Sequence, residues 1–364
     1  MTIRLSILSG VRHARDYLEV LRRSPDFDLV GVSEDEQAPD WAVADSRAVA
    51  DAAGVAFVDP DTALASSDAV LVCSEATRHA RLAARCVRAG RHVLVDKPAA
   101  VSGADLVELT DAASDAPGVI VSSIHRLLSP AVARARRDID AGRVGLPLSF
   151  DAEWIASGGL DGTAVERPGL VCDPALAGGG ELTNFGWYPV LALHHLSGLE
   201  VVEVFGFGAA LFSAAGAGWQ HADFGVEDSA TVSLKLENAV TATITVARVP
   251  AGVSHEAVGS TIRVVGSHGS LVIDEGAPSL SGRRVGGSVE RSTIGLPSGD
   301  SALRACFADF ARAVRGEAPP CVTLEDISRA VRVQDAARKS IATGRPVTVL
   351  DAGRASRDPA EPIR

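Results

Sequence analysis

The length of 364 residues suggests two domains, and a share of 46% hydrophobic and 22% charged residues is typical of a soluble globular chain. The formal net charge of −11 argues against nucleic acid and anionic membranes as partners. Five widely spaced cysteines without a CxxC pair favour reduced thiols in the cytoplasm and give no metal site. We expect neither a signal peptide nor a membrane segment, because no apolar run reaches about 18 residues.

The first third of the chain alternates short apolar runs with amphipathic segments. Strands are expected at residues 3–8, 29–32, 68–73, 92–95 and 119–122. Helices are expected at 14–23, with Tyr17 turned inward, and at 79–89, which Gly90 ends. This alternation predicts right-handed crossovers and a doubly wound parallel sheet, whose ligands bind outside the carboxyl ends of the strands.

A different pattern follows the fifth expected strand. An amphipathic helix is expected at 131–141, and strand-like runs recur from about Leu148 onward. Asn238 lies where a short turn would join two of these runs, so residues 230–246 are expected to form a hairpin in an antiparallel sheet. The stretch 276–299, which is rich in Gly, Ser and Arg, is expected to be a flexible loop.

The most informative stretch is 93–98, where an acid, a lysine and a proline follow three apolar strand residues directly. Pro98 restricts Lys97 to an extended conformation and so directs its side chain. Only three of the 35 basic residues are lysine, and lysine, unlike arginine, is a donor that can give up a proton. Lys97 is therefore a candidate for chemistry, and the alternative is a surface lysine after a strand.

The first strand-to-helix turn, residues 8–14, is where a dinucleotide fingerprint would read GxGxxG. Of these glycines only Gly10 is present. We expect Gly10 and Val11 to border a cofactor with their main chain, and Arg12 or His13 to supply positive charge to a phosphate. The alternative is an ordinary tight turn.

Two further strand ends carry candidate cofactor contacts. Glu34 lies about 20 residues beyond the first turn, where an acid binds ribose hydroxyls and repels a 2′-phosphate, which favours NAD over NADP. Ser74, Glu75 and His79 follow the third expected strand, and Thr77 is expected to cap the next helix. His79 would orient this loop or touch the cofactor. The alternatives are a solvated acidic loop and a surface histidine.

A second focus begins with three consecutive glycines at 178–180, which allow close approach of the main chain. The residues that follow, through about Leu196, are expected to be one helix, with Asn184, Tyr188 and His195 near one face. A tyrosine near a lysine can act as acid and base on a hydroxyl, because the cation lowers its pKa from about 10. The alternative is a tyrosine packed in the core.

Three more residues are candidates for binding. His125 and Arg126 follow the fifth expected strand, where both could reach a polar substrate. Trp154, at the end of the first strand of the second region, would stack on a cofactor ring or lie in the core.

The order of these segments resembles the Gfo/Idh/MocA family of glucose–fructose oxidoreductase, inositol dehydrogenase and rhizopine-catabolism proteins, to about Leu350. Residues 89–98 are similar to the family's AGKHVxxEKP, and residues 178–188 to its GGGxLxDxGxH. Further positions match at His79, His125, Arg126, Pro130 and residues 266–271, which resemble GxxGxL.

The resemblance implies an α/β fold in two domains. A Rossmann domain with a doubly wound parallel sheet is expected at 1–125, an α+β domain with a large open, mostly antiparallel sheet at 126–350, and a flexible tail at 351–364. It also implies a nicotinamide cofactor, a sugar or polyol substrate, and a homodimer or homotetramer.

The resemblance assigns roles to individual residues. The lysine that matches Lys97, which follows Asp96, helps to bind cofactor and substrate and assists proton transfer. Tyr188 replaces the usual acid/base histidine, as in the sugar- and dihydrodiol-oxidising branch. Three departures stand out: the glycine fingerprint is degraded, Asn184 replaces an aspartate, and Leu191 replaces a later one.

Three functions remain open from the sequence. The first is NAD(P)-dependent hydride transfer to or from a carbinol or keto carbon of a sugar, polyol or glycoside. In the second, tightly bound NAD is recycled, giving net epimerisation, elimination or glycoside cleavage through a keto intermediate. The third is a non-catalytic protein that binds NAD or a sugar.

Overall fold

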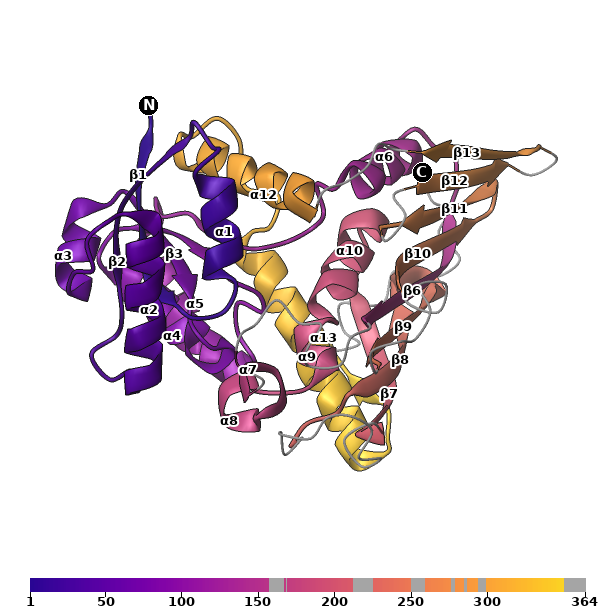
Figure 1. The fold of residues 1–364 in the computed structure, drawn as a ribbon. Coiled ribbons are helices and arrows are strands. Elements are labelled where there is room, and N and C mark those ends of the chain that lie inside the picture. The colour runs from indigo at the N-terminus through magenta and orange to yellow at the C-terminus, as the bar shows by residue number, and fades with distance from the viewer. Residues whose placement is uncertain are drawn as a thin grey trace. The chain divides into compact units, whose positions relative to one another are not determined.

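The computed structural model describes residues 1–156, 167, 169–211, 225–249, 259–275, 279–284, 287–293 and 299–349. Contacts divide the chain into two compact units (Figure 1). Unit 1 consists of Met1–Arg126, Thr163–Gly179 and Ser298–Val331, and unit 2 of Leu127–Gly162, Gly180–Pro297 and Arg332–Arg364. Unit 1 therefore includes two segments from the range that the sequence assigned to the second domain.

Unit 1 contains a five-stranded parallel sheet in the order β2-β1-β3-β4-β5. The strands are β1 (Ile3–Gly10), β2 (Phe27–Ser33), β3 (Ala69–Cys73), β4 (His92–Val95) and β5 (Val121–Ser123). The chain passes from β1 to β2 on one side and to β3 on the other, which is the switch point where such sheets bind ligands. The predicted doubly wound parallel sheet is confirmed.

Helices connect these strands and carry apolar faces. They are α1 (Ala14–Leu21), α2 (Asp40–Ala53), α3 (Pro60–Ser66), the 3₁₀ turn η1 (Ala76–Arg78), α4 (His79–Arg88) and α5 (Gly103–Asp115). Unit 1 also contains α7 (Gly169–Cys172), α8 (Pro174–Ala177), α12 (Gly299–Val314) and the first part of α13 (Leu324–Thr343). The expected cap at Thr77 is wrong, because its Oγ1 donates instead to the carbonyl oxygen of Ala175 at 3.0 Å.

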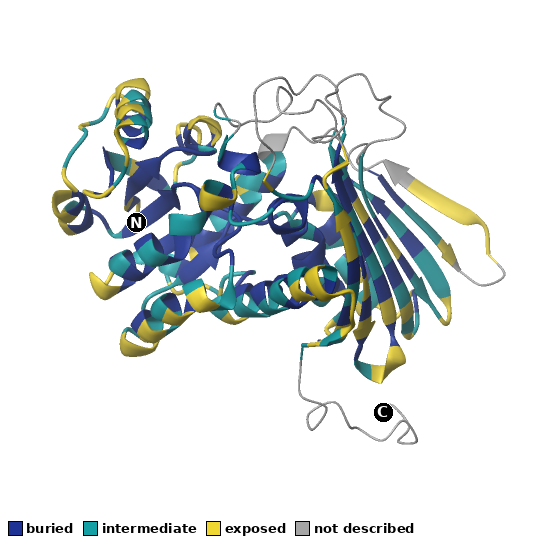
Figure 2. Cartoon of the chain, turned by 90° about the horizontal axis from the view of Figure 1, so that it is seen from below, coloured by how far each residue is buried: buried dark blue, intermediate teal, exposed yellow. Residues whose placement is uncertain are grey.

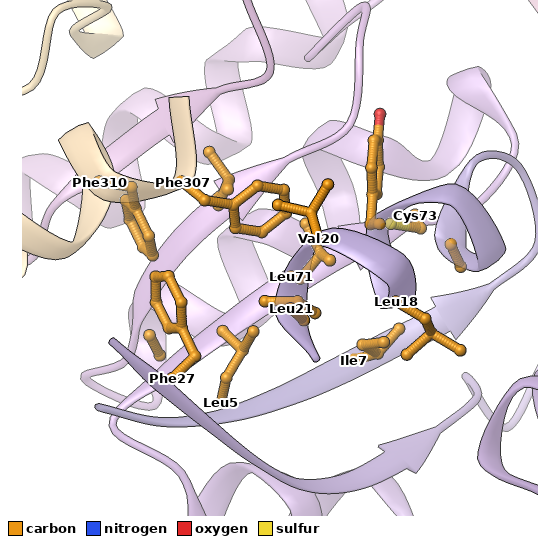
Figure 3. Packing of buried hydrophobic residues seen from close by; sticks show 14 of the residues in the cluster. Leu5, Ile7, Leu18, Val20, Leu21, Phe27, Leu71, Cys73, Phe307 and Phe310 are labelled. Carbon is orange, nitrogen blue, oxygen red and sulfur yellow. The ribbon is translucent and has the colours of Figure 1, made fainter. Parts of the chain in front are cut away.

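An aromatic cluster packs α1 and α12 against the parallel sheet (Figure 3). The Phe307 ring lies 5.8 Å from the ring of Tyr17 and 5.9 Å from that of Phe27. Phe310 stacks on Phe27 with 6.4 Å between ring centroids. This packing fixes α1, and with it the turn between β1 and α1, because rings at these distances interlock with specific geometry.

Unit 2 is built on a nine-stranded sheet in the order β13-β12-β11-β10-β6-β9-β8-β7-β14. All its neighbouring strands are antiparallel except β6 and β9. The strands are β6 (Pro147–Ala156), β7 (Val201–Ala209), β8 (Ser229–Leu236), β9 (Thr241–Arg248), β10 (Gly259–Gly266), β11 (Gly269–Asp274), β12 (Ser279–Arg284), β13 (Val289–Thr293) and β14 (Val347–Thr348). Buried and exposed residues alternate along several strands (Figure 2), as in a sheet with one covered face.

The hairpin expected around Asn238 is confirmed. β8 and β9 pair antiparallel, and the turn η2 (Glu237–Ala239) joins them with Asn238 at φ 57°. The flexible loop expected at 276–299 is wrong, since β12 and β13 lie within it. The main chain of β12 is hydrogen-bonded to β11. The Gly- and Ser-rich sequence of this segment gives no sign of a strand, because such residues are uncommon in strands.

Unit 2 also contains α6 (Pro130–Asp140), α9 (Glu181–Asn184) and α10 (Trp187–Ser197). The single helix expected from Glu181 onward is wrong, because a two-residue turn at Phe185 and Gly186 separates α9 from α10. There the main-chain N–H of Gly186 donates to Glu181 at 3.0 Å, one residue further back than in an α-helix. Asn184 and Tyr188 therefore lie on two short helices.

Gly186→Ala is expected to destabilise unit 2 by about 1–3 kcal/mol, as overpacking does. A Cβ at this position would lie 2.2 Å from the carbonyl oxygen of Leu182. Gly259→Ala is the control, because nothing lies within 4 Å of a Cβ there. Urea unfolding of both variants measures the difference, and equal midpoints would contradict this account of the turn.

No helix in the described part of the chain is both long and apolar enough to cross a membrane. Among the same residues, no group of three or more His, Cys, Asp or Glu side chains is arranged to hold a metal ion.

Candidate functional site

The carboxyl ends of all five parallel strands carry residues that the sequence singled out. These are residues 10–13 at the end of β1, Glu34 after β2, residues 74–75 after β3, residues 96–97 after β4 and residues 125–126 after β5. Most of these side chains are buried, including those of Lys97 (3% exposed) and Asp96 (0% exposed). Polar side chains gathered at this edge form a candidate ligand site, since doubly wound sheets bind their ligands there.

Asp96 is the centre of a buried hydrogen-bond network. Its carboxylate accepts from Tyr17 Oη at 2.5 Å, from His13 Nδ1 at 2.8 Å and from the main-chain N–H of Lys97 at 2.7 Å. Arg12 Nε lies 3.9 Å away. Burial alone would raise the pKa of Asp96, but the charges of His13 and Arg12 and the hydrogen bonds outweigh it and hold that pKa well below its usual range. Asp96 thus connects the first turn to the segment that carries Lys97.

The first turn is held by main-chain contacts. The N–H groups of Val11 and Arg12 donate to the carbonyl oxygen of Cys73 at 3.2 and 3.0 Å. A Cβ on Gly10 would lie 3.0 Å from the Val49 side chain, so this glycine allows α2 to pack closely on β1. Arg12 and His13 directly precede α1, where a helix N-terminus and two basic side chains suit an anionic pyrophosphate. The turn therefore fits a dinucleotide despite its single glycine.

Glu34 belongs to a buried group of opposite charges. Its carboxylate accepts from Ser46 Oγ at 2.7 Å, from the N–H of Asp35 at 2.9 Å and from Arg78 Nη1 at 3.2 Å. Arg78 also donates to both carboxylate oxygens of Glu75, at 2.5 and 2.8 Å. One guanidinium is shared by two carboxylates, so this group keeps a negative charge.

His79 is fully buried. Its Nδ1 lies 2.7 Å from the carbonyl oxygen of Pro98 and its Nε2 lies 2.8 Å from that of Ser74. Burial lowers the pKa of His79, against the opposing effect of Asp96 and of both carbonyls. The ring links the loop after β3 to the segment that carries Lys97.

The fifth strand end is placed against α12. His125 is buried, and its Nε2 lies 4.0 Å from Asp309. Arg126, the next residue, is half-buried.

In unit 2, Tyr188 and Trp154 form a pair of stacked rings. Their centroids lie 4.9 Å apart with an interplanar angle of 25°. Trp154 is 7% exposed, whereas Tyr188 is half-buried. The indole, on the covered face of β6, thereby supports the phenol ring that the sequence singled out. His195, further along α10, is half-buried, and its carbonyl oxygen accepts from Arg136 Nη1 at 2.5 Å.

The short helix α9 is fixed by Glu227, which precedes β8, and by Arg248 of β9. Glu227 accepts from the N–H groups of Gly180 and Leu182, both at 3.1 Å, and burial raises the pKa of its carboxyl. A Cβ on Gly180 would lie 1.8 Å from the carbonyl oxygen of Glu227, so glycine is required here. Arg248, at the end of β9, binds Glu181, and Glu181 in turn accepts from Asn184.

Sequence reasoning missed several of these groups. Tyr17 was expected only as a core residue, although it lies one helical turn beyond His13. Arg78 and Ser46, which flank Glu34, and the pair Glu181–Arg248 carried no local signal, because their partners are 12 to 67 residues away.

The fold and the residues at the strand ends are those of a class of protein that has a parallel sheet of the dinucleotide-binding type and a second unit built on a large mixed sheet. Residues 7–125 match the family description "Oxidoreductase family, NAD-binding Rossmann fold", and residues 132–272 match "GFO/IDH/MocA C-terminal domain". The chain belongs to the Gfo/Idh/MocA family of oxidoreductases, as the resemblance predicted, and it carries an NAD-binding Rossmann fold.

Individual relatives agree with this assignment. A 1,5-anhydro-D-fructose reductase of Ensifer adhaerens is 28% identical over 299 residues, which cover 80% of this chain and 81% of the relative. An inositol 2-dehydrogenase of Rhizobium meliloti is 29% identical over 147 residues, 40% of this chain and 43% of the relative. The crystal structure of an oxidoreductase domain protein from Kribbella flavida has a TM-score of 0.82 at 19% identity, covering 96% of this chain and 100% of that one.

Proposed function

We propose that the protein catalyses hydride transfer between a nicotinamide dinucleotide and a carbinol or keto carbon of a sugar, polyol or glycoside. The observation that carries this proposal is the buried Asp96–Lys97 pair at the carboxyl end of β4, tied by Asp96 to the first turn of the parallel sheet. The names of the relatives, an anhydrofructose reductase and an inositol dehydrogenase, support a polyhydroxylated substrate.

The residues at the strand ends have distinct roles in this proposal. Arg12 and His13 supply positive charge to the pyrophosphate, and the main chain of Gly10 and Val11 borders it. Glu34 binds a ribose hydroxyl through the acceptor capacity that its three donors leave, since a carboxylate accepts about four hydrogen bonds. The loops at Ser74–Glu75 and Asp96 border the cofactor, and His79 orients them. When bound, the nicotinamide supplies the hydride acceptor or donor.

Proton transfer is assigned to Tyr188, whose hydroxyl exchanges the proton of the reacting carbinol. Lys97 assists with its positive charge and holds a substrate hydroxyl. Trp154 is assigned to support the Tyr188 ring. This role takes the place of the cofactor stacking that was expected for Trp154 from the sequence. Further hydroxyls of the substrate are assigned to His125, Arg126, Asn184 and His195.

NAD is expected to bind more tightly than NADP by at least about tenfold, because a like charge beside a 2′-phosphate costs affinity. Glu34 and Glu75 both bind the guanidinium of Arg78, so two carboxylates share one cation in this group. Glu34→Gln should reduce the ratio of the Kd for NADP to the Kd for NAD. Glu36→Gln, which changes an exposed acid two residues further on, should leave this ratio unchanged. Calorimetric Kd values for both cofactors test this, and a preference for NADP in the unaltered protein would contradict it.

The proposal as a whole is tested by the absorbance at 340 nm. The purified protein is mixed with NAD and myo-inositol, or with NADH and 1,5-anhydro-D-fructose, and then with a panel of sugars, polyols and glycosides. A steady change in absorbance with one compound supports the proposed dehydrogenase activity. A single burst with product formed beyond it would favour tightly held, recycled NAD. No change, without calorimetric NAD binding, would contradict the proposal and favour a non-catalytic protein.

A further inference from the structure

A buried ion pair in unit 2 controls the orientation of one amide. Arg248 Nε lies 2.6 Å from Glu181 Oε1, and the two side chains are 3% and 1% exposed. The Arg248 guanidinium also lies over the ring of Phe185, 4.9 Å from its centroid. Glu181 Oε2, the other oxygen of the same carboxylate, lies 3.0 Å from Asn184 Nδ2. Arg248, Glu181 and Asn184 thus form a chain of contacts from the end of β9 to the end of α9.

The chemistry of these groups allows only one orientation of the amide. A carboxylate paired with a guanidinium has no proton to donate, so it only accepts hydrogen bonds. Asn184 must therefore turn its nitrogen toward Glu181, which turns its Oδ1 away from that carboxylate. The family pattern has an aspartate at position 184, which would place a carboxylate oxygen about 3.0 Å from Glu181 Oε2. The two carboxylates would repel each other, and only the Arg248 guanidinium would neutralise them.

We propose that Arg248 is a positioning residue that, through Glu181, holds Asn184 with Oδ1 toward the substrate, so that position 184 selects a hydroxyl that donates. The part about the substrate rests on the proposed function. Arg248 touches neither the reacting atoms nor the cofactor in this account, and it acts on Asn184 through Glu181.

The orientation can be measured without any ligand. The chain contains only two asparagines, Asn184 and Asn238, so the full-length protein labelled with ¹⁵N at asparagine side chains gives two NH₂ signals. Asn238 lies exposed in the β8–β9 turn, and Asn238→Asp assigns its signal. The Asn184 protons should exchange with water at least about tenfold more slowly than those of Asn238, because they are buried and bound to a carboxylate. Equal exchange rates would overturn the proposal.

The coupling is tested with a pair of variants. Glu181→Leu with Arg248→Met replaces both charges by apolar groups, which buried pairs usually tolerate, and should shift the Asn184 signal and speed the exchange of its protons. Arg248→Met should alter the signal in the natural background but not once Glu181 is Leu, because its effect passes through that residue. Arg263→Met, at an exposed ion pair of the same sheet, is the control and should leave the signal unchanged.

The substrate part has its own readout. For the polyol identified at 340 nm, the double variant should raise KM by roughly threefold to tenfold with kcat little changed, as expected for a lost hydrogen bond present in both ground and transition states. Arg248→Lys, which keeps the charge, should restore part of this loss. A shifted Asn184 signal with an unchanged KM would overturn the role in specificity. Absence of turnover in the natural protein would contradict the proposed function, while the exchange rates still decide the orientation.

Discussion

Replacing Tyr188 by Phe is expected to lower kcat by about 10²- to 10⁴-fold, the range that a positioned general acid or base contributes. The ring would remain stacked on Trp154, 4.9 Å away, so the fold and KM should change little. Only the hydroxyl that exchanges the proton of the carbinol would be lost. Steady-state rates at 340 nm measure the effect, and calorimetry should show unchanged NAD binding.

Tyr17→Phe provides the contrast, since Tyr17 is the other tyrosine of the chain. Its hydroxyl donates to buried Asp96, so the variant should lose about 1–3 kcal/mol of stability and keep most of its kcat. If Tyr188→Phe retained kcat within about threefold while Tyr17→Phe did not, the proton donor would have to be sought elsewhere.

Asp96→Asn is expected to destabilise the folded protein by about 3–5 kcal/mol and to weaken cofactor binding. The substitution leaves His13 and Arg12 without a carboxylate at a position that is 0% exposed, and removal of one partner from a buried ionic group is costly. Urea unfolding at pH 7 measures the loss. Glu108→Gln is the control, because its ion pair with Arg88 lies at the surface and contributes little.

The pH dependence of this penalty has a definite sign. The pKa of Asp96 is lowered in the folded state from its ordinary value of 3.8, so its contribution is present above that value and is lost as the pH falls through the folded pKa. The difference in unfolding free energy between the natural protein and Asp96→Asn should therefore shrink below about pH 4. A difference that stayed constant from pH 7 to pH 3 would show that the carboxylate charge is not the cause.

The sequence predicted the parallel sheet and the edge where its polar residues gather, because strand ends in a doubly wound fold have one geometry. It also located Glu34 and Lys97 by their distance from the strands. It did not predict that Asp96 binds Tyr17 and His13, since the register of α1 against β4 follows from packing around Phe307 rather than from local pattern.

Fewer features of unit 2 could be predicted from the sequence. The turn at Gly186 interrupts the helix after Asn184 through a bond to the carbonyl oxygen of Glu181, and a Cβ there would meet Leu182, which no periodicity reveals. The pairing of Glu181 with Arg248 joins residues 67 positions apart, and it depends on the register of β9. Glycine-rich strands such as β12 also lack the β-branched residues by which strands are recognised.

The most direct test of the central claim follows a single hydride. A polyol that turns over, deuterated at the carbinol carbon, is incubated with the protein and NAD, and the location of the deuterium is determined by NMR. The proposed mechanism predicts one deuterium at C4 of the nicotinamide for each ketone formed. Deuterium released into water, or ketone formed without deuterated NADH, would contradict direct hydride transfer to free NAD.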